Sequence, residues 1–458
     1  MNTSDYSLAV PDDTRRQLAA GWLMLGLASL MFSGIFSVLL VLARTPYVQN
    51  YFPWVDFFHT ALVVHVDLSV LVWFLAFGGV LWSINSTPRF LGVGRLALLL
   101  AALGALLMTA APFFGSGEAI MSNYIPILPR PLFLAGLLSF AAGMALLTLR
   151  AMGVIPPVGQ VMAGSAALRF GLNTAAVSVM LALIAFAWSY FTVPDSLHGK
   201  PYYELLFWGG GHVLQFTYTL LMLVAWLWLA SASGVKLAIT PRVALIFFGF
   251  GLVAVFFTPI IYYAYPVTAV EHIQLFTWLM RYGGSLAALP LSLALLHGLW
   301  CAPVATVNGQ PLRAALTMSM ILFGAGGVIG FMISGANVTI PAHYHGSIVG
   351  VTLALMGLTY HLLPLFGFGV PEMKLARLQP YLYGGGQLLH VTGLVISGGY
   401  GVQRKVAGAE QALDTTGRVL GMGLMGLGGL VSVAGGFLFI YVCYRAIWSR
   451  DVARKAPS

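Results

Sequence analysis

Long apolar runs follow one another along the whole chain, and short polar or proline-containing segments separate them. Runs of about 18 or more apolar residues are typical of helices that span a membrane. The pattern predicts an all-α integral membrane protein, residues 1–458, that forms a single membrane domain. Its twelve expected transmembrane helices cover residues 17–44, 57–84, 92–115, 127–151, 168–193, 203–232, 241–264, 276–299, 313–334, 341–366, 378–400 and 418–447.

Composition and charge favour a membrane location. Of the 458 residues, 59% are hydrophobic and 8% are charged, whereas soluble domains carry about a quarter charged residues. A net charge of +9 would suggest nucleic acid as the partner of a soluble protein, but here topology explains it. With both termini cytoplasmic, 15 of the 22 Lys and Arg residues fall inside, as the positive-inside rule requires. We therefore expect a multi-pass protein of a bacterial-type inner (cytoplasmic) membrane, in contact with lipid and without nucleic acid.

Two histidines lie two positions apart in the apolar segment TIPAHYHGSIV, residues 339–349. A helix turns by about 100° per residue, so His343 and His345 point about 200° apart and cannot bind one metal together. Ionisable residues inside a membrane are functional by default, and imidazole is the usual protein ligand of haem iron. One haem on each side of the helix explains the spacing. A pair of hydrogen-bonded polar residues lining a cavity is the alternative.

A second histidine-bearing helix carries the segment VVHVDLSV, residues 63–70. His65 lies at a depth similar to that of His343 and His345, so a haem between these two helices is geometrically possible. His59 is turned some 120° away from His65, which favours an interfacial histidine. Asp67 points about 200° away from His65 and is a candidate polar or proton-relay group.

Two more segments place chemistry-bearing residues at the outer side. His212 follows three glycines in WGGGHVLQF, and glycine permits close approach of the backbone to a large group. Glu271 and His272 are adjacent in AVEHIQ. A carboxylate and imidazoles at similar depth indicate a metal site. The alternative for Glu271 is an interfacial acid exposed to water.

Taken in order, these segments resemble the catalytic subunit (subunit I) of the haem-copper oxidase and nitric oxide reductase superfamily. The segment AHYHGSIVGVTLALMGLTYHLLP is similar to the histidine-pair helix of that family, and HVTGLVISGGYGVQRK is similar to its next helix and the basic pair that follows. The resemblance covers nearly the whole chain and implies the twelve-helix arrangement of subunit I.

The resemblance implies two haems. His65 and His345 would be the axial ligands of a low-spin haem b that receives electrons. His343 would be the proximal ligand of a high-spin haem, of b3 or a type, whose other face is open to a gas. Arg404 and Lys405 would bind the haem propionates, since basic side chains form charge-assisted hydrogen bonds with carboxylates. The alternative for this basic pair is two solvated loop charges.

The resemblance also implies one non-haem metal, copper or iron, held by His212 and His272. We include Glu271 as a third ligand and as a catalytic proton-transfer group. Gln215, three residues after His212, is a further catalytic candidate.

Two departures from the oxidase pattern favour nitric oxide as the substrate. Most oxygen-reducing members carry a tyrosine four residues after the histidine that corresponds to His212, and here this position is Phe216. Oxygen reducers with the tyrosine on the following helix remain an alternative, because that helix ends in Tyr262, Tyr263 and Tyr265. The adjacent His-His pair of the family reads Glu271-His272, which resembles several nitric oxide reducing branches.

The sequence therefore predicts the catalytic subunit of a respiratory nitric oxide reductase, as used in denitrification. Two NO molecules would be reduced to N2O and water at a centre of high-spin haem and non-haem metal. A terminal oxygen reductase that uses cytochrome c or quinol is the alternative, and a haem-containing transporter or sensor is a more distant one. Because no soluble domain remains, we expect a second subunit with a cytochrome c or a cupredoxin (CuA-type) domain. The outer acids Glu118, Glu204 and Glu271 could supply protons.

Overall fold

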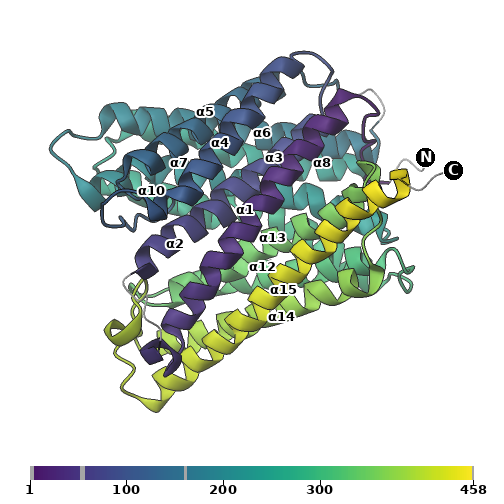
Figure 1. The fold of residues 1–458 in the computed structure, drawn as a ribbon. Coiled ribbons are helices and arrows are strands. Elements are labelled where there is room, and N and C mark those ends of the chain that lie inside the picture. Colours follow the sequence, from purple (N-terminus) through teal and green to yellow (C-terminus); the bar gives the residue numbers. More distant parts are fainter. Residues whose placement is uncertain (1–4, 52–56, 159–161, 456–458) are drawn as a thin grey trace. The chain divides into compact units, whose positions relative to one another are not determined.

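A computed structural model describes residues 5–51, 57–158 and 162–455, with side chains as far as residue 449 (Figure 1). Within these ranges the regular structure is helical, and β-structure is limited to two isolated bridges, Ile120 with Ile127 and Asn337 with Gln403. The all-α fold class is confirmed.

The helices fall into a long series with short irregular turns between them. The α-helices are α1 Thr14–Arg44, α2 Phe58–Val66, α3 Trp73–Ile84, α4 Leu91–Ala110, α5 Pro131–Gly153, α6 Gly164–Thr192, α7 Gly199–Ala232, α8 Pro241–Val255, α9 Phe257–Ala264, α10 Val270–Trp278, α11 Ser285–Trp300, α12 Gln310–Phe331, α13 Thr339–Leu365, α14 Met373–Gly399 and α15 Thr416–Lys455. The short segments are η1 Val48–Tyr51, η3 Asp67–Val72, η4 Ala111–Phe113, η5 Leu279–Gly283 and η6 Gly408–Gln411.

These elements form twelve long helical segments, which correspond one to one to the twelve expected helices. Eleven of the segments in the described part of the chain are long and apolar enough to cross a membrane. The twelfth is α14, which is not in that set; Gln379, Gln387 and His390 in its interior lower its hydropathy. The number and order of helices expected from the apolar runs are confirmed.

One boundary shift affects the candidate site. The segment expected at 276–299 begins at Val270, after the extended residue Ala269. Glu271 and His272 therefore lie in the first turn of α10 and not in the preceding loop. The apolar run starts later than the helix because these two polar residues lower the local hydropathy.

Two of the long segments contain a π-helical turn. The segment η3 separates α2 from α3 and follows His65 within two residues. The segment η5 separates α10 from α11 and begins seven residues after His272. Such bulges interrupt the regular hydrogen bonding and occur frequently at functional sites.

The chain divides into two compact units, each built from two stretches of sequence. Unit 1 consists of Met1–Gly26 and Leu71–Val304, and unit 2 consists of Leu27–Val70 and Ala305–Ser458. His212 and His272 belong to unit 1, whereas His65, His343 and His345 belong to unit 2. The expectation of a single domain stays a prediction.

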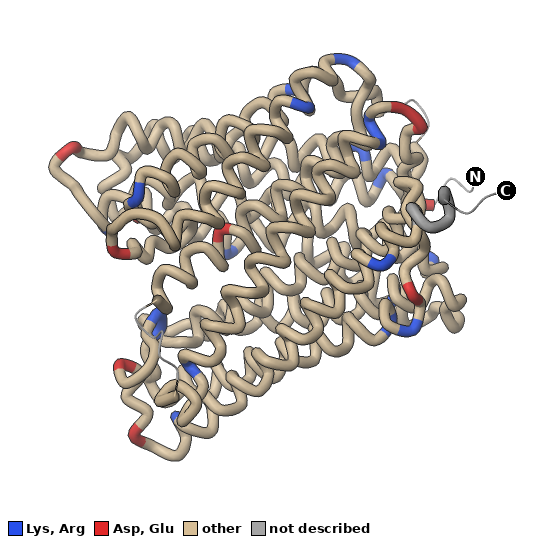
Figure 2. The backbone as a smooth tube through the Cα atoms, in the orientation of Figure 1, with Lys and Arg blue, Asp and Glu red and all other residues tan. Residues whose placement is uncertain are grey.

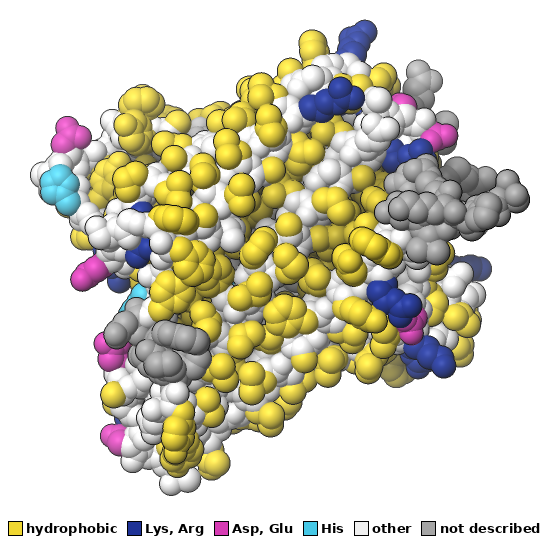
Figure 3. All heavy atoms as spheres, viewed as in Figure 1, with side chains coloured by type: hydrophobic (Ala, Val, Ile, Leu, Met, Phe, Trp, Pro, Cys, Tyr) yellow, Lys and Arg dark blue, Asp and Glu magenta, His cyan; other side chains and the backbone are white. Residues whose placement is uncertain are grey.

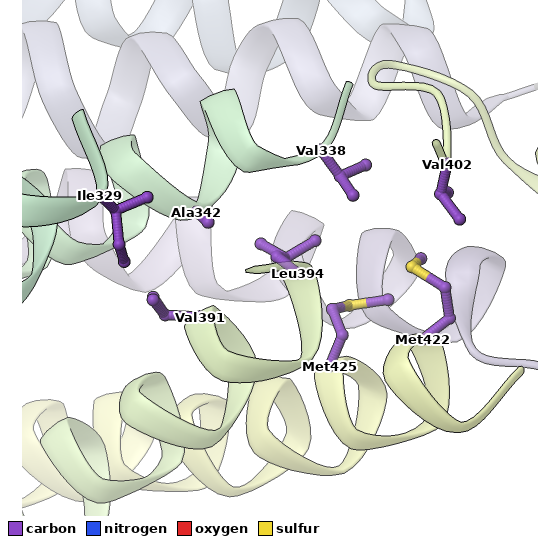
Figure 4. Packing of buried hydrophobic residues seen from close by; sticks show 8 residues of the cluster. All are labelled: Ile329, Val338, Ala342, Val391, Leu394, Val402, Met422 and Met425. Atoms are coloured by element: carbon purple, nitrogen blue, oxygen red, sulfur yellow. The ribbon is translucent and has the colours of Figure 1, made fainter. Parts of the chain in front are cut away.

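A buried apolar cluster holds together the helices of unit 2 that carry histidines (Figure 4). Its members come from α12 to α15, from the residue before α13 and from the turn after α14: Ile329, Val338, Ala342, Val391, Leu394, Val402, Met422 and Met425. Ala342 directly precedes His343 in the sequence, and Val391 directly follows His390. Packing of the neighbouring residue therefore fixes the backbone from which each of these imidazoles projects.

The outward faces of the helices suit a lipid environment. Charged residues lie mainly near the helix ends, and long helical stretches between them carry almost none (Figure 2). Hydrophobic side chains cover most of the face in view in Figure 3. Large apolar side chains in helix interiors are exposed, such as Leu99 at 64% and Leu138 at 70%. The chain is an integral, multi-pass membrane protein.

Candidate haem and metal centres

His212 lies in α7 and both of its ring nitrogens have partners. Nδ1 lies 2.7 Å from the carbonyl oxygen of Trp208, one turn earlier in the helix. Because a carbonyl only accepts, Nδ1 carries the ring proton and Nε2 is the acceptor. Nε2 lies 2.8 Å from the phenolic oxygen of Tyr124, which therefore donates to it. Tyr124 belongs to the irregular segment between η4 and α5, and sequence reasoning missed it.

The glycines before His212 make room for aromatic rings of the chain itself. A Cβ on Gly211 would collide with the ring of Tyr124, and a Cβ on Gly209 would collide with the hydroxyl of Tyr262. The close approach expected at this glycine run therefore brings Tyr124 to His212 and Tyr262 to the backbone of α7. It is the reason why Tyr124 can reach His212.

His272 is almost fully buried at the start of α10, with 1% of its surface exposed. Its Nδ1 lies 3.2 Å from the carbonyl oxygen of Tyr265. Its Nε2 is buried and has no hydrogen-bond partner among the described residues. An imidazole fixed in this way presents an unused lone pair, which is the state that a metal ligand needs.

His212 and His272 are held near each other by packing between α7 and α10. The indole nitrogen of Trp208 donates to the carbonyl oxygen of Ile273 at 3.2 Å, which ties the two helices together. Both imidazoles contact Phe276, with ring centroids 6.0 Å from His212 and 5.0 Å from His272.

Glu271 lies on a different face from these imidazoles. Its side chain is exposed to solvent, whereas His272 beside it is buried. The described residues contain no group of three His, Cys, Asp or Glu side chains that could hold a metal. The structure therefore does not bring Glu271 to both histidines, and its role as a ligand stays a prediction. Gln215 is half-buried in α7, and its catalytic role also stays a prediction.

The position of the oxidase tyrosine is filled by a buried phenyl ring. Phe216 is 2% exposed and lies against Gly283, so α7 offers no hydroxyl there. Among the tyrosines at the end of α9, the ring of Tyr262 meets that of His272 edge-on, with centroids 4.8 Å apart. The hydroxyl of Tyr262 is engaged by Ser189, at 2.7 Å.

In unit 2, His343 points from α13 toward α12. Its Nδ1 lies 2.7 Å from the carbonyl oxygen of Gly326. The missing side chain of Gly330 leaves room for the ring, because a Cβ there would come within 2.8 Å of the imidazole. The ring is only partly buried although it lies in a long apolar helix. Because the carbonyl occupies Nδ1, Nε2 is the ring nitrogen that remains for a ligand.

His65 is held in the same manner by α1. Its Nδ1 lies 3.1 Å from the carbonyl oxygen and 2.9 Å from the hydroxyl of Ser33. The same hydroxyl donates to the carbonyl oxygen of His65. His65 is also only partly buried.

His345 points toward α14, where it meets His390. The two ring centroids are 4.5 Å apart, and Arg44 and His65 lie near enough to interact electrostatically with His345. The Nε and Nη2 atoms of Arg44 are buried and have no hydrogen-bond partner among the described residues. A buried guanidinium without a counter-charge is costly, so this place fits an anionic group such as a haem carboxylate.

His390 and Arg44 were both missed by sequence reasoning. His390 is a lone histidine within an apolar helix, a pattern that buried structural histidines share. Arg44 lies at the end of α1, where a cation usually faces water. The available signal for His390 was that a membrane-embedded ionisable residue is costly and is therefore a functional candidate by default.

The basic pair Arg404 and Lys405 lies in the turn after α14 and is partly buried. The Nε2 of His59 lies 2.9 Å from the carbonyl oxygen of Lys405, whose backbone adopts a positive φ of 63°. His59 is in α2, six residues and about 9 Å along the helix from His65. The structure therefore ties the basic pair to the helix that carries one candidate haem ligand. Propionate binding stays a prediction.

Asp67 is a buried acid two residues after His65, at the start of η3. It is 1% exposed, and neither carboxylate oxygen has a hydrogen-bond partner among the described residues. Its expected role as a polar or proton-relay group stays a prediction.

Four of the histidines implied as ligands share one arrangement. In His65, His212, His272 and His343 the Nδ1 faces a backbone carbonyl oxygen, and Nε2 carries the lone pair. This is the usual setting of metal-binding imidazoles, because the second hydrogen bond fixes the tautomer and the ring plane. His59 has the opposite tautomer, since its Nε2 donates to Lys405.

Two known proteins resemble the chain in sequence over most of its length. No family model matches the chain. It is 28% identical to the uncharacterized protein RP382 of Rickettsia prowazekii (strain Madrid E), over 497 aligned positions that cover 94% of the chain and 96% of that protein. It is also 28% identical to an uncharacterized protein of Aquifex aeolicus (strain VF5), over 363 positions, 79% of the chain and 88% of that protein.

Among solved structures, the chain is similar to a haem-copper terminal oxidase dimer determined by cryo-electron microscopy. The TM-score is 0.74 at 16% sequence identity, over 98% of this chain and 85% of that one. The chain therefore has a fold like that of a haem-copper oxidase subunit I, as expected from its motifs.

Proposed function

We propose that the chain is the catalytic subunit of a haem-dependent reductase of a small gas, and that the gas is nitric oxide. Two NO molecules, two electrons and two protons would give N2O and water. A low-spin haem b, a high-spin haem of b3 or a type and one copper or iron would supply the redox chemistry. The observation that carries the proposal is the shared setting of the four anchored histidines, whose Nε2 lone pairs suit metal ions.

Phe216 supports nitric oxide over oxygen as the substrate. In most oxygen-reducing members of the family a tyrosine at that position serves oxygen cleavage, and this chain has a buried phenyl ring there. With only His212 and His272 as imidazole ligands, the non-haem metal would keep positions for oxygen ligands, which favours iron over copper.

Turnover with the two gases tests the proposal. Purified protein supplied with a reductant is expected to consume NO and release N2O much faster than it consumes O2. Metal analysis of the same preparation should find one non-haem metal for every two haems. Faster consumption of O2 would overturn the choice of nitric oxide, and gas binding without turnover of either gas would overturn the proposal of an enzyme.

Oxygen reduction is the second candidate, and Tyr124 is the observation that favours it. The phenol of Tyr124 donates to Nε2 of His212, so a tyrosine contacts this candidate ligand although it comes from another segment of the chain. The preference for NO or O2 would then depend on whether this phenol supplies an electron as well as a proton.

Glu271 suits proton delivery better than metal binding, because its carboxylate is exposed next to the buried His272. We expect Glu271→Gln to lower NO turnover by about tenfold, the lower end of what outer partners of a metal contribute. The content of non-haem metal should stay unchanged. Metal analysis and turnover on the same sample check this, with Asp195→Asn as an exposed acidic control. Loss of the metal in Glu271→Gln would instead make Glu271 a ligand.

Electrons would enter at the low-spin haem from a second subunit with a cytochrome c or cupredoxin (CuA-type) domain. A bacterial inner membrane is part of the proposal, and so is this partner. The partner is supported by the short connections between the long helices that the structure describes, which leave no room there for an electron-carrying domain. Co-purification of a haem c or CuA signal with the tagged chain would support the partner.

A further inference from the structure

His345 differs from the other candidate ligands in how its ring is supported. In the described part of the chain, no backbone carbonyl oxygen holds its Nδ1, whereas carbonyls hold those of His65 and His343. A ligand imidazole with an unsupported Nδ1 would be free to rotate about its metal bond. Another group must supply the support if His345 binds a haem iron.

One face of α14 offers that support. Gln387 and His390 are three residues apart and therefore lie on the same side of the helix. Gln387 is 8% exposed, and its Oε1 is buried without a hydrogen-bond partner among the described residues. Its side chain lies near enough to interact with the imidazole of His345, although no hydrogen bond is completed in this structure. A buried amide oxygen left unpaired is costly, because it loses its hydrogen bonds to water without gaining one in the protein.

Residues of α15 fix the position of the His390 side chain. Its Nδ1 lies 2.9 Å from the carbonyl oxygen of Met425. A Cβ on Gly428 would collide with the backbone nitrogen of His390, and a Cβ on Gly429 would come within 3.2 Å of its Nδ1. The two glycines thus let α15 approach α14 closely enough for the hydrogen bond. Because His390 is anchored in this way, its ring restricts the positions that the contacting ring of His345 can adopt.

We propose that Gln387 and His390 are positioning residues for His345 at the low-spin haem. Gln387 Oε1 accepts the Nδ1 proton of His345, which leaves Nε2 for the haem iron. The ring of His390, 4.5 Å from that of His345 and tilted by 56°, limits rotation of the imidazole. This inference rests on the haem site of the proposed function but not on which gas is reduced.

The two residues should affect different properties of the haem. A hydrogen bond from Nδ1 makes the ligand more basic and stabilises ferric iron, so it lowers the reduction potential. Loss of Gln387 Oε1 should raise the potential. Loss of the His390 ring should leave the imidazole plane free and change the electron paramagnetic resonance spectrum of the ferric low-spin haem.

The test uses the purified full chain with its haems. Gln387→Met keeps the size of the side chain and removes the acceptor, so the midpoint potential of the low-spin haem should shift upward. Gln387→Glu offers a stronger acceptor, and the potential should shift downward. His390→Ala should shift the g values of the low-spin signal, and His390→Phe should restore most of the original spectrum. Thr392→Val, on an exposed face of α14, is the matched control and should change neither property.

Unchanged potentials in both Gln387 variants, or shifts in the same direction, would overturn the role of Gln387. A failure of His390→Phe to restore the spectrum would overturn the role of the His390 ring. If the unaltered protein lacks a six-coordinate haem, the proposed cofactor set fails together with this inference. If the six-coordinate haem is present but the variants change neither its midpoint potential nor its electron paramagnetic resonance spectrum, this inference alone fails.

Discussion

Replacing His345 by alanine is expected to remove the low-spin haem while leaving the high-spin haem in place. The two histidines of the HxH segment contact different helices: His343 faces Gly326 of α12, and His345 faces His390 of α14. Loss of one ligand should therefore spare the site of the other. Without the haem that receives electrons, turnover should fall by at least about 100-fold, the upper end of what outer partners of a metal contribute.

Absorption spectra of the reduced protein, with and without carbon monoxide, measure the two haems separately. The His345→Ala variant should lose the low-spin bands and keep the carbon monoxide shift of the high-spin haem. The His343→Ala variant should show the reverse pattern. His361→Ala, sixteen residues and about 24 Å further along α13, is the control and should keep both haems. Loss of the same haem in both HxH variants would contradict the assignment of one haem to each side.

The helix count could be predicted because each apolar run needs only its own length and composition to be recognised. The α14 segment shows how far this extends: it was expected as a helix although Gln387 and His390 make it less apolar than the others. The start of α10 shows the limit of hydropathy as a guide to helix ends. The polar residues Glu271 and His272 lower the local hydropathy, so the first turn of α10 was not predicted as helix. Where function places polar groups in a helix, hydropathy underestimates its length.

The positions of single histidines could be predicted, but their partners could not. Helix geometry alone separates His343 from His345 by about 200°. The carbonyl oxygens that hold the ligand rings belong to other helices or to loops in several cases, such as Gly326 for His343. Tyr124 lies 88 residues before His212 in an irregular segment, and no local pattern joins the two. Such contacts depend on tertiary packing.

Replacing Tyr124 by phenylalanine is expected to lower turnover by about 100-fold, the lower end of what a positioned proton donor contributes. The phenol and a metal ion compete for one lone pair, the Nε2 of His212. If His212 held a metal through Nε2, the hydroxyl of Tyr124 would lose this partner and could donate its proton to a substrate oxygen. A phenyl ring keeps the packing against Gly211 and loses only the donor.

Turnover with NO and with O2, and the haem and metal content, are measured on the same samples. The matched control is Tyr218→Phe: Tyr218 is also buried in unit 1, but its ring packs against Phe74 with centroids 4.8 Å apart. The control should keep full turnover, and both variants should keep their haems. A loss confined to O2 would assign Tyr124 the oxidase role and favour oxygen as the substrate. Full turnover of both gases in Tyr124→Phe would exclude the phenol as the donor, and the protons would then have to reach the gas by another route, such as from Glu271.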